Sequence, residues 1–169
     1  MPGLDTARAK ASRVRLIIFD VDGVLTDGSI SYASDGEERK RFHVRDGSAV
    51  IRALRRGLKI AWVSGRRATA VERRASELGV ADLFQGIEDK RPVFERLRRE
   101  GGFKKEETAY LGDDHGDVEL FESVGFSAAP ADAHPAARAR ADYLCSLRGG
   151  EGAAGEAIDF IIECREDGR

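Results

Sequence analysis

Two aspartates directly follow an apolar run near the start of the chain. Residues 16–19 are Leu-Ile-Ile-Phe, and Asp20, Asp22 and Gly23 come next. A continuous apolar run is typical of a buried parallel strand, and ligands bind α/β sheets at the carboxyl ends of such strands. Because side chains alternate along an extended segment, both carboxylates would point the same way. Two neighbouring carboxylates repel each other, so the pair indicates either a bound metal cation or, more simply, a turn and a helix N-cap after a core strand.

Three further groups of polar residues lie at the ends of later predicted elements. The first follows the apolar run 58–63, the second precedes a predicted helix, and the third follows the run 108–112. They are Ser64 with Gly65, Lys90, and Asp113 with Asp117. Right-handed crossovers would bring all of them to one edge of a parallel sheet, beside Asp20 and Asp22.

These residue types suit the hydrolysis of a phosphate ester. A carboxylate such as Asp20 can attack phosphorus and form an aspartyl phosphate. Asp22 can protonate the leaving alkoxide and then deprotonate the water that cleaves this intermediate. Mg²⁺ takes one or two carboxylates together with phosphate oxygens and waters. We therefore expect Mg²⁺ at Asp20 and Asp113, with a backbone carbonyl near Asp22 as a further ligand.

The other polar residues of the set suit the surroundings of the phosphate and the metal. The Ser64 hydroxyl, backbone amides at Gly65 and the Lys90 cation can hold phosphate oxygens. Asp117 could orient Lys90 and waters on the metal. For Asp114 two interpretations stay open, contact with a metal-bound water and a solvated loop position.

Two arginines and two short polar residues have simpler alternatives. Arg45 and Arg66 could bind a substrate carboxylate, because the guanidinium fork matches that group. Each could equally form an ion pair at a surface or subunit interface. Asp46 and Ser48 are expected to be N-caps of a helix that opens at position 46.

Strand and helix patterns alternate along the chain, which predicts a mainly parallel α/β sheet flanked by helices. We expect one domain over residues 1–169, with a frayed lead-in at 1–13. Residues 28–44 predict a β-hairpin with an Asp-Gly turn at positions 35–36. Residues 149–169 predict a glycine-rich tail and a terminal helix.

Composition narrows the class of protein. The chain has 169 residues, of which 41% are hydrophobic and 34% charged, as in a soluble globular domain. A net charge of −2 gives no overall attraction to nucleic acid or to a membrane surface. Cys145 and Cys164 lack metal-ligand spacing, which favours a reducing cytoplasm. Residues 1–13 show no apolar signal-peptide core, and no apolar run approaches membrane-spanning length.

In this order, the four groups of polar residues resemble the motifs of the haloacid dehalogenase superfamily. The matching stretches are 20–26 (Asp-Val-Asp-Gly-Val-Leu-Thr), 64–66 (Ser-Gly-Arg), Lys90 and 112–117 (Gly-Asp-Asp-His-Gly-Asp). The resemblance implies a Rossmann-like fold and a Mg²⁺-dependent phosphatase. In such an enzyme Asp20 would be the nucleophile and Asp22 the general acid and base.

Further stretches are similar to the family of 3-deoxy-D-manno-octulosonate 8-phosphate phosphatases, over residues 13–163. They are residues 42–47, 64–67, 84–86, 131–135, 141–143 and 149–153. This resemblance implies an acidic sugar phosphate as substrate, a place in lipopolysaccharide synthesis, and a homotetramer. The hairpins would form a central barrel, and a glycine-rich tail would approach a neighbour's active site.

The chain departs from this family at Gly155, where an arginine is expected. If an arginine there helps the tail reach the substrate, its absence changes tail function or sugar specificity. Related members act on nine-carbon keto-acid 9-phosphates, and that substrate class stays open as an alternative.

Larger superfamily members carry a cap domain in one of two gaps between motifs. Here residues 23–63 predict only a hairpin, a helix and a strand, and residues 65–89 one helix and a short strand. Neither gap can house a cap. Because a bare site excludes water poorly, a neighbouring subunit is expected to act as the lid.

Two other classes of protein compete with the phosphatase. A phospho-accepting signalling domain also pairs acids with Ser and Lys around Mg²⁺, but it has no leaving alcohol for Asp22 to protonate. A catalytically dead interaction subunit would not need the complete set of acids.

Overall fold

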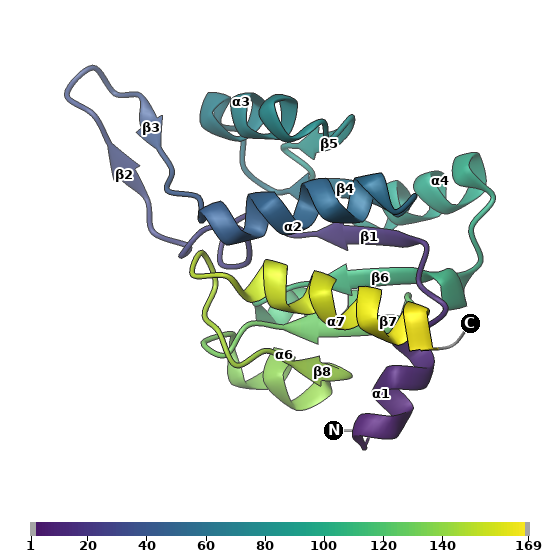
Figure 1. Ribbon diagram of the computed structural model, residues 1–169. Coiled ribbons are helices and arrows are strands. Elements are labelled where there is room, and N and C mark those ends of the chain that lie inside the picture. The colour runs from purple at the N-terminus through teal and green to yellow at the C-terminus, as the bar shows by residue number, and fades with distance from the viewer. Residues whose placement is uncertain (1–2, 168–169) are drawn as a thin grey trace.

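A six-stranded parallel sheet forms the centre of the computed structural model, which describes residues 3–167 (Figure 1). The strand order is β5-β4-β1-β6-β7-β8, and every neighbouring pair is parallel. The strands are β1 (Leu16–Phe19), β4 (Lys59–Ser64), β5 (Asp82–Gln85), β6 (Thr108–Leu111), β7 (Phe126–Ala129) and β8 (Tyr143–Leu144). The prediction of a mainly parallel, Rossmann-like sheet is confirmed. Residues 1–2 of the expected lead-in and 168–169 of the expected tail lie outside the described residues.

Strand β1 occupies the middle of the sheet and sets the edge at which the chemistry gathers. Phe19 is in register with Trp62 of β4 on one side and with Leu111 of β6 on the other. The next residue, Asp20, donates its backbone N–H to the Leu111 carbonyl at 2.9 Å. The residues that follow β1, β4 and β6 therefore leave the sheet at the same edge.

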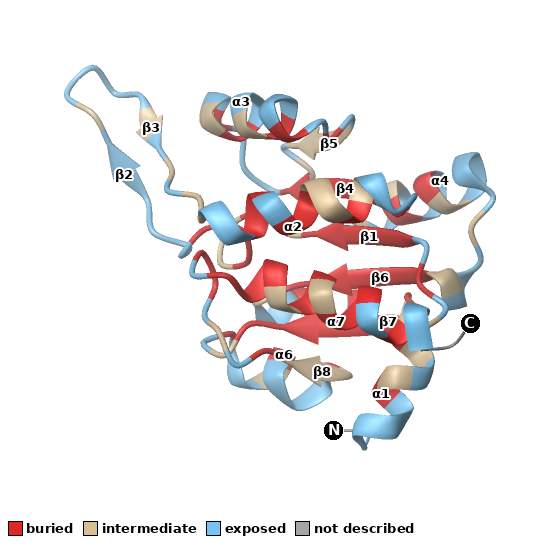
Figure 2. Cartoon of the chain, viewed as in Figure 1, coloured by how far each residue is buried: buried red, intermediate tan, exposed pale blue. Residues whose placement is uncertain are grey.

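Apolar residues of β1 alternate between two hydrophobic cores. Ile17 and Phe19 belong to one core, and Leu16 and Ile18 to the other. This alternation explains why the strand is buried on both faces (Figure 2). One face is covered by α1 (Leu4–Ala11), α2 (Val44–Arg55), α3 (Thr69–Leu78) and α7 (Ala153–Asp167), and the other by α4 (Arg91–Gly101), α5 (Val118–Phe121) and α6 (Pro135–Arg140).

Helix α1 replaces most of the frayed lead-in expected at residues 1–13, so that expectation was wrong for residues 4–11. Ala7 and Ala11 are fully buried in the core that also contains Ile161 of α7. These small side chains on one face let the short helix pack closely against α7, and packing of this kind stabilises a helix too short to form alone. Within residues 3–167, no helix combines the length and the apolar character needed to cross a membrane.

The predicted β-hairpin is present and projects from the body of the molecule (Figure 1). Its strands are short, β2 (Ser31–Tyr32) and β3 (Glu38–Arg39), and they pair antiparallel. Gly36 adopts a φ of +86° at the turn, as the Asp-Gly dipeptide predicts. Ile30 and Tyr32 are exposed, with relative accessibilities of 51% and 63%. The apolar side chains of β2 and its approach are thus left uncovered within the chain.

Helix α2 begins earlier than expected, because His43 is its N-cap and its Nδ1 accepts the Arg45 N–H at 3.2 Å. The expectation that Asp46 and Ser48 cap this helix was therefore wrong. Ser48 is exposed within the helix, whereas Asp46 is buried. One Asp46 carboxylate oxygen accepts the N–H of Gly155 at 2.7 Å, in the first turn of α7. Asp46 thus caps a different helix from the one that carries it.

The glycine-rich stretch 149–152 is not a free tail. Gly150 donates its N–H to the Val24 carbonyl at 3.1 Å, and Gly149 donates to Asp132 at 2.9 Å. A Cβ built on Gly149 would lie 1.9 Å from the Gly23 carbonyl oxygen, so only glycine permits this approach. The stretch packs against the loop after β1 of its own chain and leads directly into α7. Its approach to a neighbouring subunit stays a prediction.

The two gaps in which a cap could be inserted contain only small elements. Residues 23–63 hold the hairpin, α2 and β4, and residues 65–89 hold α3 and β5. Within the described chain neither gap carries a further folded unit, so the edge of the sheet that bears the polar residues is open.

Candidate active site

Lys90 lies at the centre of a hydrogen-bonded group between β1 and β6. The residue immediately precedes α4, and its Nζ donates to Asp20 at 2.7 Å, to Asp117 at 3.0 Å and to the Tyr110 hydroxyl at 2.9 Å. The Tyr110 hydroxyl in turn donates to the same Asp117 oxygen at 2.6 Å. The structure thus brings together three residues that the sequence placed at separate element ends, and it adds Tyr110. Sequence reasoning missed Tyr110, which reads as a core position of a buried strand.

Asp117 is buried, and both of its carboxylate oxygens are already used. Oδ1 accepts from Lys90 and Tyr110, and Oδ2 accepts the N–H groups of Asp113 and Asp114 at 3.0 and 3.1 Å. These contacts cap the short 3₁₀ turn η2 (His115–Asp117) and fix the loop that carries Asp113. Asp117 therefore orients other groups and has little capacity left to bind a metal.

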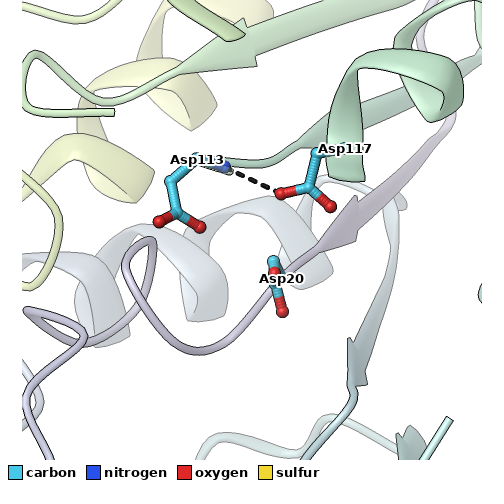
Figure 3. A group of neighbouring side chains, drawn as sticks. All are labelled: Asp20, Asp113 and Asp117. Atoms are coloured by element: carbon cyan, nitrogen blue, oxygen red, sulfur yellow. Dashed lines mark hydrogen bonds between the residues drawn. The ribbon is translucent and has the colours of Figure 1, made fainter. Parts of the chain in front are cut away.

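Asp20, Asp113 and Asp117 each present a carboxylate oxygen within 4.8 Å of the others (Figure 3). Asp113 Oδ1 is buried and has no hydrogen-bond partner among the described residues. A Cβ on Gly23 would lie 2.0 Å from Asp113 Oδ2, so the glycine leaves the space that this carboxylate occupies. Because Asp117 is saturated, a hard divalent cation would fit between Asp20 and Asp113 and satisfy the unpartnered oxygen.

Burial and excess negative charge raise the pKa values of two carboxyls in this group. Burial raises the pKa of Asp20 to about 6, and Asp117 adds to the rise while Lys90 opposes it. Burial, Asp20 and Asp117 together raise the pKa of Asp113 to about 8. Burial alone would lower the pKa of Lys90, but the charges of Asp20 and Asp117 outweigh it and raise that pKa. One lysine does not neutralise three carboxylates, which is the electrostatic condition that a metal cation corrects.

The Asp22 side chain makes its contact with the hairpin. Asp22 accepts a hydrogen bond from Lys40 Nζ, which also lies 2.8 Å from Glu38 Oε1 as an ion pair. Glu38 Oε2 accepts from the Arg66 guanidinium at 2.7 Å. The side chains of Asp20 and Asp22 thus differ in their surroundings although they are only two residues apart.

Sequence reasoning missed Lys40 and Glu38. A signal was present in the sequence. Glu38, Lys40 and Phe42 occupy every second position, and residues two apart in a strand face the same side. Phe42 stacks on Trp62 with ring centroids 6.4 Å apart, so this side faces the body of the molecule.

Ser64 and Gly65 lie at the end of β4, where the sequence placed them. The Ser64 side chain is buried and its hydroxyl accepts the Arg66 N–H at 3.1 Å, which shapes the turn. Gly65 is exposed. Arg45 is also exposed, at the start of α2, and forms no ion pair with the described residues, whereas Arg66 is paired with Glu38. The two arginines that were considered together therefore differ, because, among the described residues, Arg66 forms an ion pair and Arg45 does not.

A cavity of about 320 Å³ opens beside these groups and is lined by Asp20, Lys90, Asp114 and Asp117 among others. Asp114 is exposed in its wall and accepts the His115 N–H at 2.7 Å. Its lining is mostly acidic, with Lys90 and Arg91 as its cations, and Ser64 and Asp113 lie outside it. Arranged in this way, the site can bind a phosphate ester next to a carboxylate nucleophile and a cation.

Comparison with known proteins gives consistent matches. Residues 75–154 match the family described as haloacid dehalogenase-like hydrolase. The chain is 44% identical over 154 residues to the 3-deoxy-D-manno-octulosonate 8-phosphate phosphatase of Escherichia coli (strain K12), an alignment that covers 91% of this chain and 82% of that protein.

Solved structures agree with the sequence match. The phosphatase of the same name from Yersinia pestis superposes with a TM-score of 0.94 at 39% identity, covering 96% of this chain and 88% of that one. The one from Moraxella catarrhalis, in complex with a magnesium ion, a phosphate ion and a KDO molecule, has a TM-score of 0.94 at 33% identity and covers 98% and 95%. The chain therefore belongs to the 3-deoxy-D-manno-octulosonate 8-phosphate phosphatase family of haloacid dehalogenase-like hydrolases.

Proposed function

We propose that this chain is a Mg²⁺-dependent phosphatase that hydrolyses 3-deoxy-D-manno-octulosonate 8-phosphate to the free sugar acid and phosphate. One observation carries the proposal most directly. The Asp20 carboxylate accepts a hydrogen bond from Lys90 Nζ at 2.7 Å and lies within 4.8 Å of the Asp113 carboxylate. Oδ1 of Asp113 has no hydrogen-bond partner among the described residues, and both aspartates lie at the open edge of the sheet. Family membership, at 44% identity to a phosphatase of that name, supports the choice of substrate.

Asp20 and Asp113 would hold Mg²⁺, together with the backbone carbonyl of Asp22. When bound, the cation supplies positive charge against the phosphate and against the two carboxylates. A carboxylate oxygen of Asp20 attacks phosphorus, the bond between phosphorus and the sugar oxygen breaks, and Asp22 gives its proton to that oxygen. Asp22 then takes a proton from the water that attacks the aspartyl phosphate, so phosphate leaves and both aspartates return to their first state.

Three groups hold the phosphate in this proposal, namely the Ser64 hydroxyl, the backbone at Gly65 and the Lys90 ammonium. Asp117 keeps Lys90 in place through its 3.0 Å contact. Asp114 lies in the cavity wall, where it can contact metal-bound water. Arg66 and Arg45 are the candidates for the carboxylate of the sugar acid, and Arg66 would share its guanidinium between that group and Glu38.

Assembly into a homotetramer is part of the same proposal. Ile30 and Tyr32 of the hairpin and Val44 at the start of α2 are exposed apolar residues that a neighbouring subunit would cover. A neighbouring subunit seated there would restrict water at the cavity. We also propose a cytoplasmic location, which suits two buried free thiols, and a small-molecule substrate rather than nucleic acid or a membrane.

Phosphate release with Mg²⁺ should be measured against a panel of eight- and nine-carbon keto-acid sugar phosphates. We expect the eight-carbon 8-phosphate to give the highest kcat/KM. A preference for a nine-carbon 9-phosphate would overturn the substrate and leave the phosphatase intact, and it would give the change at Gly155 a role in specificity. A stable aspartyl phosphate without turnover would instead indicate a signalling domain. Light scattering that shows a fully active monomer would contradict the neighbouring subunit as lid.

A further inference from the structure

Lys40 is half-buried as a residue, and its side chain is covered next to the proposed acid and base. Its side chain is only 1% exposed. The ammonium group donates to Asp22 and lies 2.8 Å from Glu38 Oε1. Burial of an ammonium group is unfavourable unless carboxylates compensate it, so the position of Nζ is set by these two partners.

The hairpin delivers Lys40 to a fixed place. Phe42, two residues further on, stacks on the ring of the buried Trp62 with an interplanar angle of 15°. Glu38, two residues earlier, pairs with Arg66 in the turn after β4. The returning arm of the hairpin is therefore tied to the body on both sides of Lys40, once by an aromatic contact and once by an ion pair.

An acid that protonates a leaving group must point at one atom of the substrate. Misplacement of such a group by about 1 Å can cost about 10²-fold in rate. The Asp22 side chain is 23% exposed, and Lys40 is the one side chain of residues 3–167 that forms a hydrogen bond with its carboxylate. Without Lys40, the carboxylate would be free to rotate and would face Glu38 without an intervening cation.

We propose that Lys40 is a positioning residue for Asp22, holding the carboxyl in place for proton transfer and linking it through Glu38 and Arg66 to the conformation of the hairpin. This inference rests on the proposed phosphatase function. It implies that Lys40 matters most for substrates whose leaving group requires a proton.

Two aryl phosphates separate proton transfer from binding, namely phenyl phosphate and 4-nitrophenyl phosphate. They share one ring shape and lack the sugar carboxylate, but the phenolate needs a proton far more than the nitrophenolate. The value of kcat/KM reports the steps through formation of the aspartyl phosphate and loss of the alcohol. For Lys40→Met we expect kcat/KM to fall about 30-fold with phenyl phosphate and less than about 3-fold with 4-nitrophenyl phosphate, as for partial loss of general acid catalysis.

The ratio of the two values is measured in one preparation, so it does not depend on the fraction of protein that is folded. Arg41→Met is the matched control, because Arg41 is exposed on the same arm and pairs with Asp27 rather than with Asp22. That variant should keep the wild-type ratio. Lys40→Arg keeps a cationic donor, so its ratio should be close to that of the wild type. Asp22→Asn should shift the ratio in the same direction as Lys40→Met and by a larger factor.

Equal falls for both substrates in Lys40→Met would show a merely structural role and overturn the inference, as would an unchanged kcat/KM for both. If Asp22→Asn shifts the ratio and Lys40→Met does not, only this inference fails and the proposed function stands. A wild-type protein that hydrolyses neither aryl phosphate nor the sugar phosphate would overturn both together.

Discussion

The two aspartates after β1 belong to regions with different charge balance. Around Asp20, three carboxylates share the single cation of Lys90, and burial and mutual repulsion raise the pKa values of Asp20 and Asp113. Around Asp22, two carboxylates meet two cations, and Arg66 and Lys40 lower the pKa of Glu38. We call the first the strand-end group (Asp20, Lys90, Asp113, Asp117) and the second the hairpin group (Asp22, Glu38, Lys40, Arg66).

This difference indicates where a metal belongs and where it does not. The strand-end group lacks positive charge, and it leaves Asp113 Oδ1 without a partner. The hairpin group is neutral in itself and needs no ion. Different parts of the chain thus complete the surroundings of two carboxylates that are two residues apart, as their proposed roles of nucleophile and proton carrier require.

Asp20→Asn tests the comparison most severely. We expect kcat on the sugar phosphate to fall by about 10⁴-fold or more, because an amide cannot replace the nucleophile. Phosphate release measures the loss. The variant should keep its fold, since removal of one charge relieves repulsion in the strand-end group. Retention of more than a hundredth of the activity would move the nucleophile elsewhere and undo the assignment of roles.

Gly149→Ala tests the loop that connects the two groups. The new Cβ would collide with the Gly23 carbonyl oxygen, and we expect a loss of about 1–3 kcal/mol in the free energy of unfolding. For a chain of this size that is roughly 2–4 °C in Tm per kcal/mol, measured by thermal denaturation. Gly116→Ala is the matched control, because no atom lies within 4 Å of its Cβ position. Equal Tm values for the two variants would show that the loop after β1 is not held by the glycine stretch.

The pH dependence of stability, measured in EDTA, distinguishes the strand-end group from the hairpin group. The pKa values of Asp20 and Asp113 are raised to about 6 and about 8, above those of the unfolded chain. The folded state thus holds protons that the unfolded state has lost, and stability falls as pH rises from about 5 to 8. We expect Tm to decrease over this range and Mg²⁺ to restore it at pH 8.

Two variants decide which group causes the pH dependence. Asp113→Asn should flatten the profile and weaken the response to Mg²⁺, because it removes the carboxyl with the higher pKa. Glu38→Gln should leave the decrease between pH 5 and 8 in place, since the pKa of Glu38 is lowered. The reverse pattern would place the uncompensated charge in the hairpin group.

The strand-end group could be predicted from sequence because parallel topology alone brings it together. Asp20 and Asp113 each come shortly after an apolar strand, and the carboxyl ends of such strands share an edge. The hairpin group could not be assembled in this way. Lys40 reaches Asp22 because the returning arm of the hairpin meets the body there, where Phe42 stacks on Trp62.

Errors elsewhere have the same origin. Asp46 has the residue type of an N-cap, but its partner is Gly155, which lies on α7 and is distant in sequence. Helix α1 shows few large apolar residues, because its contact with the body is made by alanines. In each case the prediction used neighbouring residues in the sequence, whereas the contact that decides the structure is with a residue far along the chain.

The contact between the glycine stretch and the loop after β1 also bears on how the molecule is made. The loop that carries Asp22 is synthesised early, and Gly149 and Gly150, which hold it, come near the end of the chain. Every pairing of β1 is likewise with strands from later in the sequence. During translation the loop after β1 would thus lack these contacts until residues 149–150 have left the ribosome.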